Sequence, residues 1–377
     1  MRRIVILGAT RCAYAIVRKI TACTYLTDFP TRLTVIGTGA ARLSERLQEE
    51  CPGLYRENGV PHIMPVFFDY CEDALPIHRH CTGDEGELSA IVREANYLII
   101  AGEDDLKNIS RAVQLRTSLF RFHLQSNCQP LIAVRYQDEN TQWIASQVAV
   151  GSLNYTSRES ASARYHWSEN YDLKPFGSRA GFRYDQLLRN RLTQRAVNVH
   201  LSYYGLNQEH AVVHAALGDY FRRSYNRDSS ICMALGLIYH CFGMGIYHAF
   251  HEDYNWSAGD AVLGSRYQQL KQTEELREKA AAIEHARWNG WCLANGWIKP
   301  SDEELVSYLQ HQSPKHYLEI AKLHPYITGY QQLTAESHRL NELLATYQFS
   351  PKLLPDPRIS DRELTKKIPV LLGTNVI

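Results

Sequence analysis

The residues best suited to chemistry lie between positions 281 and 297, where one histidine and three tryptophans recur at fixed spacing. On a helix of 3.6 residues per turn, four of these positions share one face. They are Ala281, His285, Trp288 and Cys292. Gly296 follows the last periodic residue and predicts the end of the helix, with Trp297 folding back onto the last turn. Such a face either packs into a core or offers an imidazole and flat rings to a ligand.

Two further blocks follow downstream, Leu323-His324-Pro325-Tyr326-Ile327 and Tyr330-x-x-Leu333. Together with His285-x-x-Trp288 and Gly296-Trp297, they resemble one repeat of the ryanodine-receptor (RyR) domain family over about residues 276 to 349. The family usually has Lys or Arg where this chain has Cys292, so a phosphate contact from that position is not expected.

RyR repeats usually occur in pairs, and a degenerate upstream copy is visible. Ala196-x-x-x-His200-x-x-Tyr203 repeats the spacing of Ala281-x-x-x-His285-x-x-Trp288, and Tyr267-Gln268-Gln269-Leu270 repeats Tyr330-Gln331-Gln332-Leu333. We therefore expect residues 186–349 to form one mostly helical unit with approximate internal two-fold symmetry. His200 would superpose on His285, and Tyr203 and Trp288 would face a shared cleft. His324 and Tyr330 would pack near Trp297.

The first 150 residues alternate short apolar runs with amphipathic stretches, which predicts a βαβ arrangement. The expected strands are 4–7, 33–36, 64–68, 97–101 and 131–134, with helices near 13–24, 41–50, 87–94 and 106–125. The predicted fold class is therefore α/β, with an N-terminal doubly wound Rossmann-like parallel sheet and a mostly α-helical C-terminal RyR-repeat domain.

Ligands of such sheets bind beyond the carboxyl ends of the strands. The candidate residues at this rim are Gly8, Thr10, Arg11, Arg42 and Asp105. The dinucleotide fingerprint is damaged, because Thr10 replaces a glycine that lets backbone approach a pyrophosphate. The second strand ends in Gly37-Thr38-Gly39 and offers no carboxylate for a ribose. The stretch Gly102 to Asn108 resembles Rossmann domains of TrkA-N type from bacterial potassium-uptake regulators, but NAD(P) binding is disfavoured.

Composition narrows the class of protein. The 377 residues carry a formal net charge of +1, so no strong global field favours long nucleic acid or anionic membrane. The nine cysteines form no C-x-x-C pair, which predicts reduced thiols, a cytoplasmic location and no structural zinc. Residues 229–250 lack charged side chains, but His240, His248 and internal polar and glycine residues favour a buried helix over a membrane span. His248 and His251 with Glu252 and Asp253 are interpreted as a polar helix end and not as a metal site.

Two segments lie outside the predicted domains. Residues 151–185 show little periodicity and are interpreted as a linker or a functional loop. The tail 350–377 contains four prolines and is expected to be extended, ending in strand-like Val370-Leu371-Leu372.

The leading interpretation is a cytosolic sensor, without a predicted catalytic residue, that binds a nucleotide or nucleotide-derived signal through its RyR repeats. A purine between Tyr203 and Trp288 would bury both faces of its ring, while the histidines supply hydrogen bonds. The candidate binding residues are His200, Tyr203, His285, Trp288, Asn289, Trp297, His324 and Tyr330. By analogy, such domain pairings belong to bacterial nucleotide signalling or antiviral defence. The expected protein partner is a second copy of this chain in a homo-oligomer, or an effector protein. A NAD(P)-dependent enzyme and a regulatory subunit of an ion channel or transporter remain alternatives.

Overall fold

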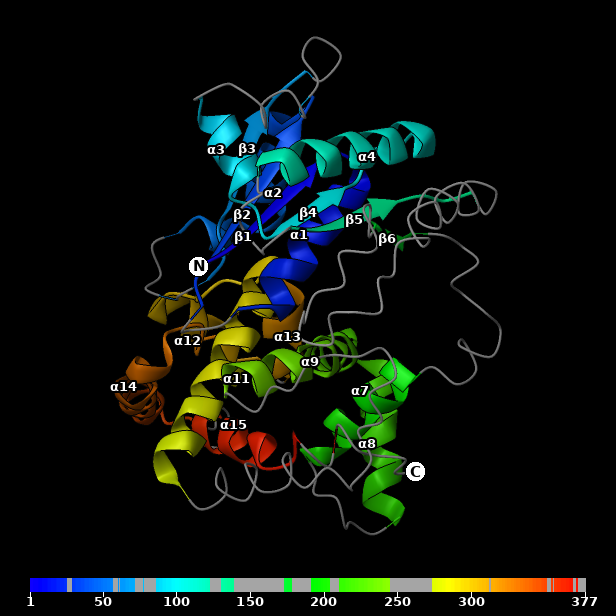
Figure 1. Ribbon diagram of the computed structural model, residues 1–377. Helices are drawn as coiled ribbons and strands as arrows, with labels where there is room; N and C mark the ends of the chain where they lie inside the picture. The colour runs from blue at the N-terminus through cyan, green and yellow to red at the C-terminus, as the bar shows by residue number, and fades with distance from the viewer. Residues whose placement is uncertain are drawn as a thin grey trace. The chain divides into compact units, whose positions relative to one another are not determined.

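The computed structural model describes most of the predicted elements (Figure 1). The described residues are 1–25, 29–56, 60, 62–71, 77, 86–122, 130–138, 173–177, 191–203, 210–244, 273–311, 313–350, 354, 356–368 and 371. They fall into two compact units. The first comprises residues 1–17, 31–47 and 64–188, and the second comprises 18–30, 48–63 and 189–377.

The first unit is built on a parallel six-stranded sheet of order β3-β2-β1-β4-β5-β6. Its strands are β1 (Arg2–Leu7), β2 (Thr31–Gly37), β3 (Pro65–Asp69), β4 (Tyr97–Ile100), β5 (Leu131–Arg135) and β6 (Leu173–Phe176). This strand order is that of doubly wound dinucleotide-binding folds. The predicted Rossmann-like α/β class is therefore confirmed. The order in which strands are added to the sheet reverses between β1 and β4, which defines the crossover point.

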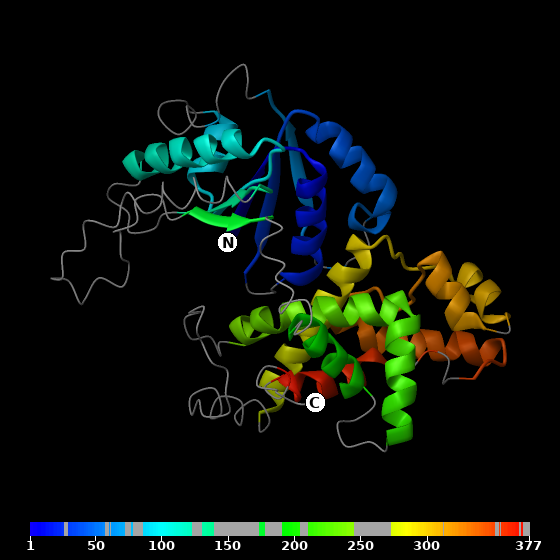
Figure 2. The ribbon, with the colours of Figure 1, turned by 90° about the vertical axis from the view of Figure 1, so that its right-hand side faces the viewer.

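Helices cover both faces of this sheet. They are α1 (Arg11–Cys23), α2 (Ala40–Glu50), α3 (Glu87–Arg93) and α4 (Asp105–Phe122), close to the predicted ranges. Figure 2 shows α1 and α2 on one face and α3 and α4 on the other. A short 3-10 turn, η1 (Pro52–Leu54), follows α2. Apolar side chains of β1, β4 and β5 form a core with Ile109, Ala112 and Leu115 of α4, as expected for parallel strands buried on both faces.

The second unit is helical in its described part. Its elements are α7 (Arg191–Ser202), α8 (His210–Arg222), α9 (Ser224–Gly243), α11 (Glu274–Ala294), α12 (Asp302–Leu309), α13 (Pro314–Ala321), η4 (Tyr330–Gln332), α14 (Leu333–Thr346) and α15 (Pro357–Thr365). Helix α11 crosses the middle of this unit, with α14 to one side and α7 and α8 to the other (Figure 1). Helices α9 and α15 pack directly on α11.

The central helix ends where the sequence predicts. Gly296 has a φ of +82°, the Gly296 amide donates to the Leu293 carbonyl, and the Trp297 amide donates to the Cys292 carbonyl over 3.0 Å. This pair of bonds is the Schellman motif, which needs a left-handed residue that only glycine adopts cheaply. The rings of Trp291 and Trp297 lie 6.2 Å apart, so Trp297 does fold back onto the last turn.

Two predictions about the flanking segments are wrong. Residues 173–176 lie inside the presumed linker 151–185, yet they form β6 and pair with β5. Within the presumed extended tail, residues 357–365 form α15. Pro357 occupies the first turn of this helix, where a missing N–H costs nothing, and the Asp356 carboxylate caps it by accepting from the Arg358 amide. Leu371 also has helical backbone, whereas Val370 and Leu372 lie outside the described residues.

Candidate functional site

A cavity of about 390 Å³ lies within the second unit, a volume in the range that holds small organic ligands. Much of its lining comes from three segments. They are α11 with His285 and Trp288, the turn 323–326 that follows α13, and the first two turns of α9. Helix α15 adds Pro357, Ser360 and Asp361, and α7 and its end add His200 and Tyr203. Six of the eight predicted binding residues line this cavity: His200, Tyr203, His285, Trp288, Trp297 and His324.

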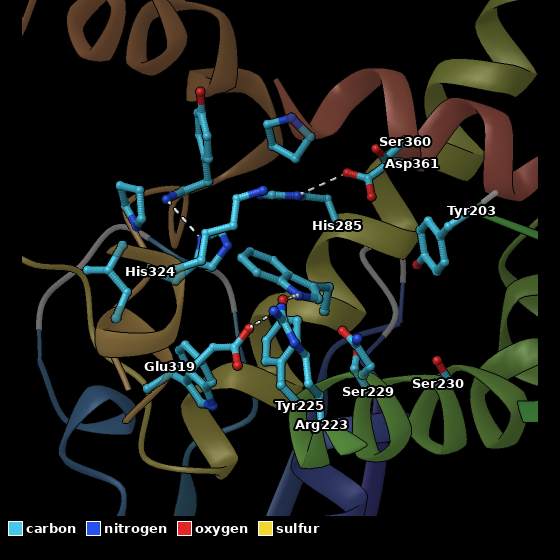
Figure 3. A pocket seen from close by; sticks show the side chains of 18 of the residues that line it. Tyr203, Arg223, Tyr225, Ser229, Ser230, His285, Glu319, His324, Ser360 and Asp361 are labelled. Atoms are coloured by element: carbon cyan, nitrogen blue, oxygen red, sulfur yellow. Dashed lines mark hydrogen bonds and ion pairs between the residues drawn. The ribbon is translucent and has the colours of Figure 1, made fainter. Parts of the chain in front are cut away.

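Trp288 forms the centre of an aromatic wall. It is only half-buried, because one side packs against the core of α12–α14 while another faces the cavity. The His324 ring meets it edge-on at 4.6 Å between centroids. The Trp288 indole N–H donates to the Tyr225 hydroxyl over 3.2 Å (Figure 3). Tyr225 in turn lies 5.0 Å from the Trp297 ring. Trp288 therefore lines the cavity with one face, and its role in ligand binding stays a prediction.

His324 presents a neutral imidazole to the cavity. Burial lowers the pKa of His324 to about 3, and the nearby His285 adds to the shift, so the ring is uncharged at neutral pH. Its Nδ1 atom accepts from the Tyr326 amide over 3.3 Å. The single ring proton therefore resides on Nε2, which has no hydrogen-bond partner within the described residues. His324 can donate one hydrogen bond to a ligand acceptor. It also lies 6.4 Å from Trp297, as predicted.

His285 is fully engaged with the protein. Its Nε2 lies 3.0 Å from the Thr328 carbonyl. Its Nδ1 lies 3.1 Å from the Asp361 carboxylate (Figure 3). A carbonyl only accepts, so Nε2 must carry a proton, and a further proton lies between Nδ1 and Asp361. Burial raises the pKa of Asp361, and the bond to His285 opposes this rise. Because neither nitrogen is free, His285 positions α15 against α11 and is not available as a general base.

A buried charge cluster lies beside this site. Both carboxylate oxygens of Glu284 accept from Arg287 over 2.8 Å, and one lies 2.9 Å from Nε2 of His240. All three side chains are about 1% exposed. Burial alone would raise the pKa of Glu284, but the charge and hydrogen bonds of Arg287, with those of His240, lower it to about 2. The cluster joins α9 to α11 directly behind the cavity.

The upstream half of the predicted repeat pair reaches the same cavity. His200 is buried on α7 and its Nε2 lies 3.0 Å from the Ala216 carbonyl, much as His285 contacts Thr328. Burial lowers the pKa of His200, so it is neutral at physiological pH. Tyr203 is 50% exposed and lies at the edge of the cavity. Each histidine thus has its Nε2 against a backbone carbonyl, and Tyr203 and Trp288 line one cavity, while the superposition of the two repeats stays a prediction.

Charged side chains gather at one end of the cavity. Arg223 precedes α9, and its guanidinium lies 3.3 Å from the Glu319 carboxylate of α13 (Figure 3). Lys315 of α13 also lines the cavity and is exposed. We call Arg223, Lys315 and Glu319 the charged rim. Its two cations exceed its single carboxylate, and the other lining carboxylates are engaged with His285 or with Arg287 and His240.

Two predicted binding residues do not line the cavity. Asn289 is about 1% exposed and donates to the Thr328 carbonyl over 2.8 Å, so it supports the same turn as His285. Tyr330 packs 6.0 Å from the His285 ring, and its hydroxyl donates to Glu278 over 2.9 Å. Cys292 is completely buried. It therefore cannot replace the cation that RyR-type sequences carry at that position.

The rim of the sheet is largely occupied by its own contacts. The Thr10 hydroxyl donates to the Ala101 carbonyl over 2.7 Å and accepts from the Ala13 amide over 3.2 Å, which joins the loop after β1 to the end of β4. Gly8 has a φ of +101°, and a Cβ there would lie 3.0 Å from the Gly102 amide nitrogen. These contacts join the loop after β1 to the loop after β4 at the crossover point, where folds of this kind place a dinucleotide pyrophosphate.

The remaining rim candidates are similarly placed. The Asp105 carboxylate accepts from the Gln137 and Asp138 amides over 2.8 and 3.0 Å. Arg11 and Arg42 are exposed on α1 and α2. The Asp69 carboxylate, from the end of β3, accepts from the Gly39 and Ala41 amides at the start of α2. The structure therefore brings the predicted rim residues to one edge of the sheet, with one carboxylate oxygen of Asp105 bound to the backbone.

Sequence reasoning missed the residues that α9, α13 and α15 contribute to the cavity. For α9 the sequence holds a pattern that could have predicted them. Polar side chains recur at helical spacing at Arg223, Asn226 and Ser230, which places them on one face. Asp356-Pro357 is a typical helix start, with an N-cap aspartate followed by a proline at the first helical position. It could have predicted α15, and with it the helical position of Asp361.

Comparisons with known proteins found no matching family model, no similar curated protein and no similar solved structure. Within the described ranges, no helix is long and apolar enough to cross a membrane. The described residues also contain no cluster of three or more His, Cys, Asp or Glu that could hold a metal ion. The predicted Tyr267–Leu270 block and the His248–Asp253 group lie outside the described residues.

Proposed function

We propose that this protein is a sensor that binds a nucleotide or a nucleotide-derived signal in the cavity of its helical unit. The observation that carries this proposal is the half-buried face of Trp288, which lines a cavity beside the free N–H of His324. A base that covers the indole face would gain roughly 1–3 kcal/mol from stacking. A ring nitrogen or carbonyl of that base would accept the His324 proton.

The resemblance to RyR repeats gives independent support, because it selected Trp288 and His324 from the sequence alone. Both ring nitrogens of His285 are occupied, which favours binding over catalysis, since this imidazole is not free to exchange a proton with a ligand. His200 and His285 instead fix the walls of the cavity. A role in bacterial signalling or antiviral defence would follow if binding changes how the protein acts on a partner.

Calorimetric titration with nucleoside monophosphates and cyclic oligonucleotides tests the proposal. Trp288→Ala is expected to weaken binding by about tenfold or more, from the lost stacking. Trp288→Phe keeps an aromatic face and is expected to retain much of the affinity. Tyr317→Ala removes an exposed aromatic side chain of α13 that does not line the cavity, and serves as the control. Equal affinities for the parent and a folded Trp288→Ala protein would refute the proposal.

A further inference from the structure

The charged rim suggests which end of the ligand lies where. We infer that a phosphoryl group of the ligand binds between Arg223, Lys315 and the first turn of α9, and that this group displaces Glu319 from Arg223. This inference rests on the proposed nucleotide function and adds to it that the cavity selects phosphorylated nucleosides over free nucleosides.

Charge is the first argument. Arg223 and Lys315 are the only Lys or Arg side chains among the described residues that line the cavity. The side chain of Arg223 is 44% exposed, and its ion pair with Glu319 is a single contact of 3.3 Å. Exposed pairs of this kind contribute little to stability, so a doubly charged oxyanion competes well for the guanidinium. Lys315 has no ion-pair partner within the described ranges and is free to join it.

The second argument is the direction of α9. This helix of 20 residues begins at Ser224, next to Arg223, with no acidic residue in its first turn. Its N-terminal amides and helix dipole therefore favour a negative charge at the charged rim. Tyr225 and Asn226 of the same turn line the cavity, so this end of the helix borders the site.

A buried hydroxyl gives the third argument. Ser230 is 3% exposed and lines the cavity. Figure 3 shows Arg223 just before α9, with Ser229 and Ser230 farther along that helix. A polar stripe thus runs from the charged rim into the cavity. A sugar or phosphate oxygen of a ligand in the cavity can accept a hydrogen bond from the Ser230 hydroxyl.

The cavity then has two ends of different chemistry. The aromatic wall at Trp288 and His324 suits an uncharged base, and the charged rim suits an anion. The position at which the RyR resemblance places a basic residue is Cys292, which is buried here. In this chain the cations come instead from the start of α9 and from α13.

Calorimetry on the full-length protein tests the inference by comparing adenosine, guanosine, cytidine and uridine with their 5′-monophosphates, and with inorganic phosphate. We expect at least one monophosphate to bind tenfold or more tightly than its nucleoside. Arg223→Ala and Lys315→Ala should each reduce that ratio several-fold, whereas Arg222→Ala, an exposed arginine outside the cavity lining, should not. Glu319→Gln should strengthen monophosphate binding, because it removes the competing carboxylate.

The outcomes separate the two proposals. A nucleoside and its monophosphate that bind equally well would overturn the phosphoryl site and leave the nucleotide cavity standing. Inorganic phosphate that binds in an Arg223-dependent way without any nucleoside contribution would leave the anion site and overturn the nucleotide function. No binding by any of these probes would overturn the phosphoryl site, and if cyclic oligonucleotides also fail to bind, the nucleotide function is overturned as well. Unchanged thermal unfolding of each variant shows that a lost affinity is not a lost fold.

Discussion

Replacement of Glu284 by alanine should destabilise the helical unit strongly. The substitution leaves Arg287 buried without its carboxylate, and removal of one partner from a buried ion pair typically costs about 3–5 kcal/mol. The pKa gives a similar magnitude. A carboxyl whose pKa falls from 4.5 to about 2 on folding contributes roughly 3 kcal/mol when fully ionised.

The pH dependence of this contribution has a defined sign. The folded protein holds Glu284 ionised more firmly than the unfolded chain does, so the stabilisation is present above pH 4.5. It is lost as the pH falls from 4.5 toward 2. Glu284→Gln keeps the shape of the side chain but cannot titrate. The difference in free energy of unfolding between the parent and Glu284→Gln should therefore shrink across that window.

Urea unfolding followed by tryptophan fluorescence measures this, since α11 and its end carry Trp288, Trp291 and Trp297. The double variant Glu284→Leu, Arg287→Leu removes both charges and should recover much of the stability lost in Glu284→Ala, because hydrophobic replacement of a buried pair is often neutral. A cost below about 1 kcal/mol for Glu284→Ala, or a difference that does not change with pH, would refute the reasoning.

Three other predictions concern single positions. The pKa of His324 is lowered to about 3, so protonation of this side chain favours unfolding as the pH falls from 6.5 to 3. His324→Gln should therefore reduce the slope of unfolding free energy against pH by up to about 1.4 kcal/mol per pH unit in that window. Urea unfolding midpoints measured across the window test this. Gly296→Ala should lower the free energy of unfolding by more than the roughly 1–2 kcal/mol of a left-handed alanine, because its Cβ would lie 2.4 Å from the Glu50 carbonyl oxygen. Gly39→Ala, also at positive φ but with open space around the added Cβ, should lower it only by that amount. Thermal unfolding of both variants tests this. NAD(H) and NADP(H) should bind weakly or not at all, because Thr10 puts a β-branched side chain where the backbone must approach a pyrophosphate, with its hydroxyl bound to Ala101. Calorimetry that detects micromolar or tighter binding would contradict this.

The sequence was sufficient to predict the elements whose residues carry a clear local pattern. The sheet strands β1 to β5 are apolar runs between turn residues, and α11 ends at a glycine that only a left-handed turn requires. Strand β6 escaped prediction because it is a short edge strand containing Lys174 and Pro175, and its pairing with β5 is a tertiary contact. Helix α15 escaped because the prolines were interpreted as breakers, although Pro357 stands where a helix tolerates it.

Some residues of the candidate site could be predicted from the sequence, and others depend on tertiary packing. Trp288 and His324 were found because their spacing resembles a known repeat, and both line the cavity. Asp361 could not be assigned to His285 from the sequence, since 76 residues separate them and the contact depends on how α15 packs on α11. The charged rim likewise exists only because α9 and α13 meet in the fold.

Photoaffinity labelling with 8-azidoadenosine 5′-monophosphate, followed by mass spectrometric mapping, tests the nucleotide cavity most directly. The label is expected on peptides that contain residues 285–297 or 323–326, to be reduced by unlabelled adenosine monophosphate, and to be lost in Trp288→Ala. Competed label on residues 8–12 or 37–42 at the rim of the sheet would contradict the account, as would the absence of any competed label.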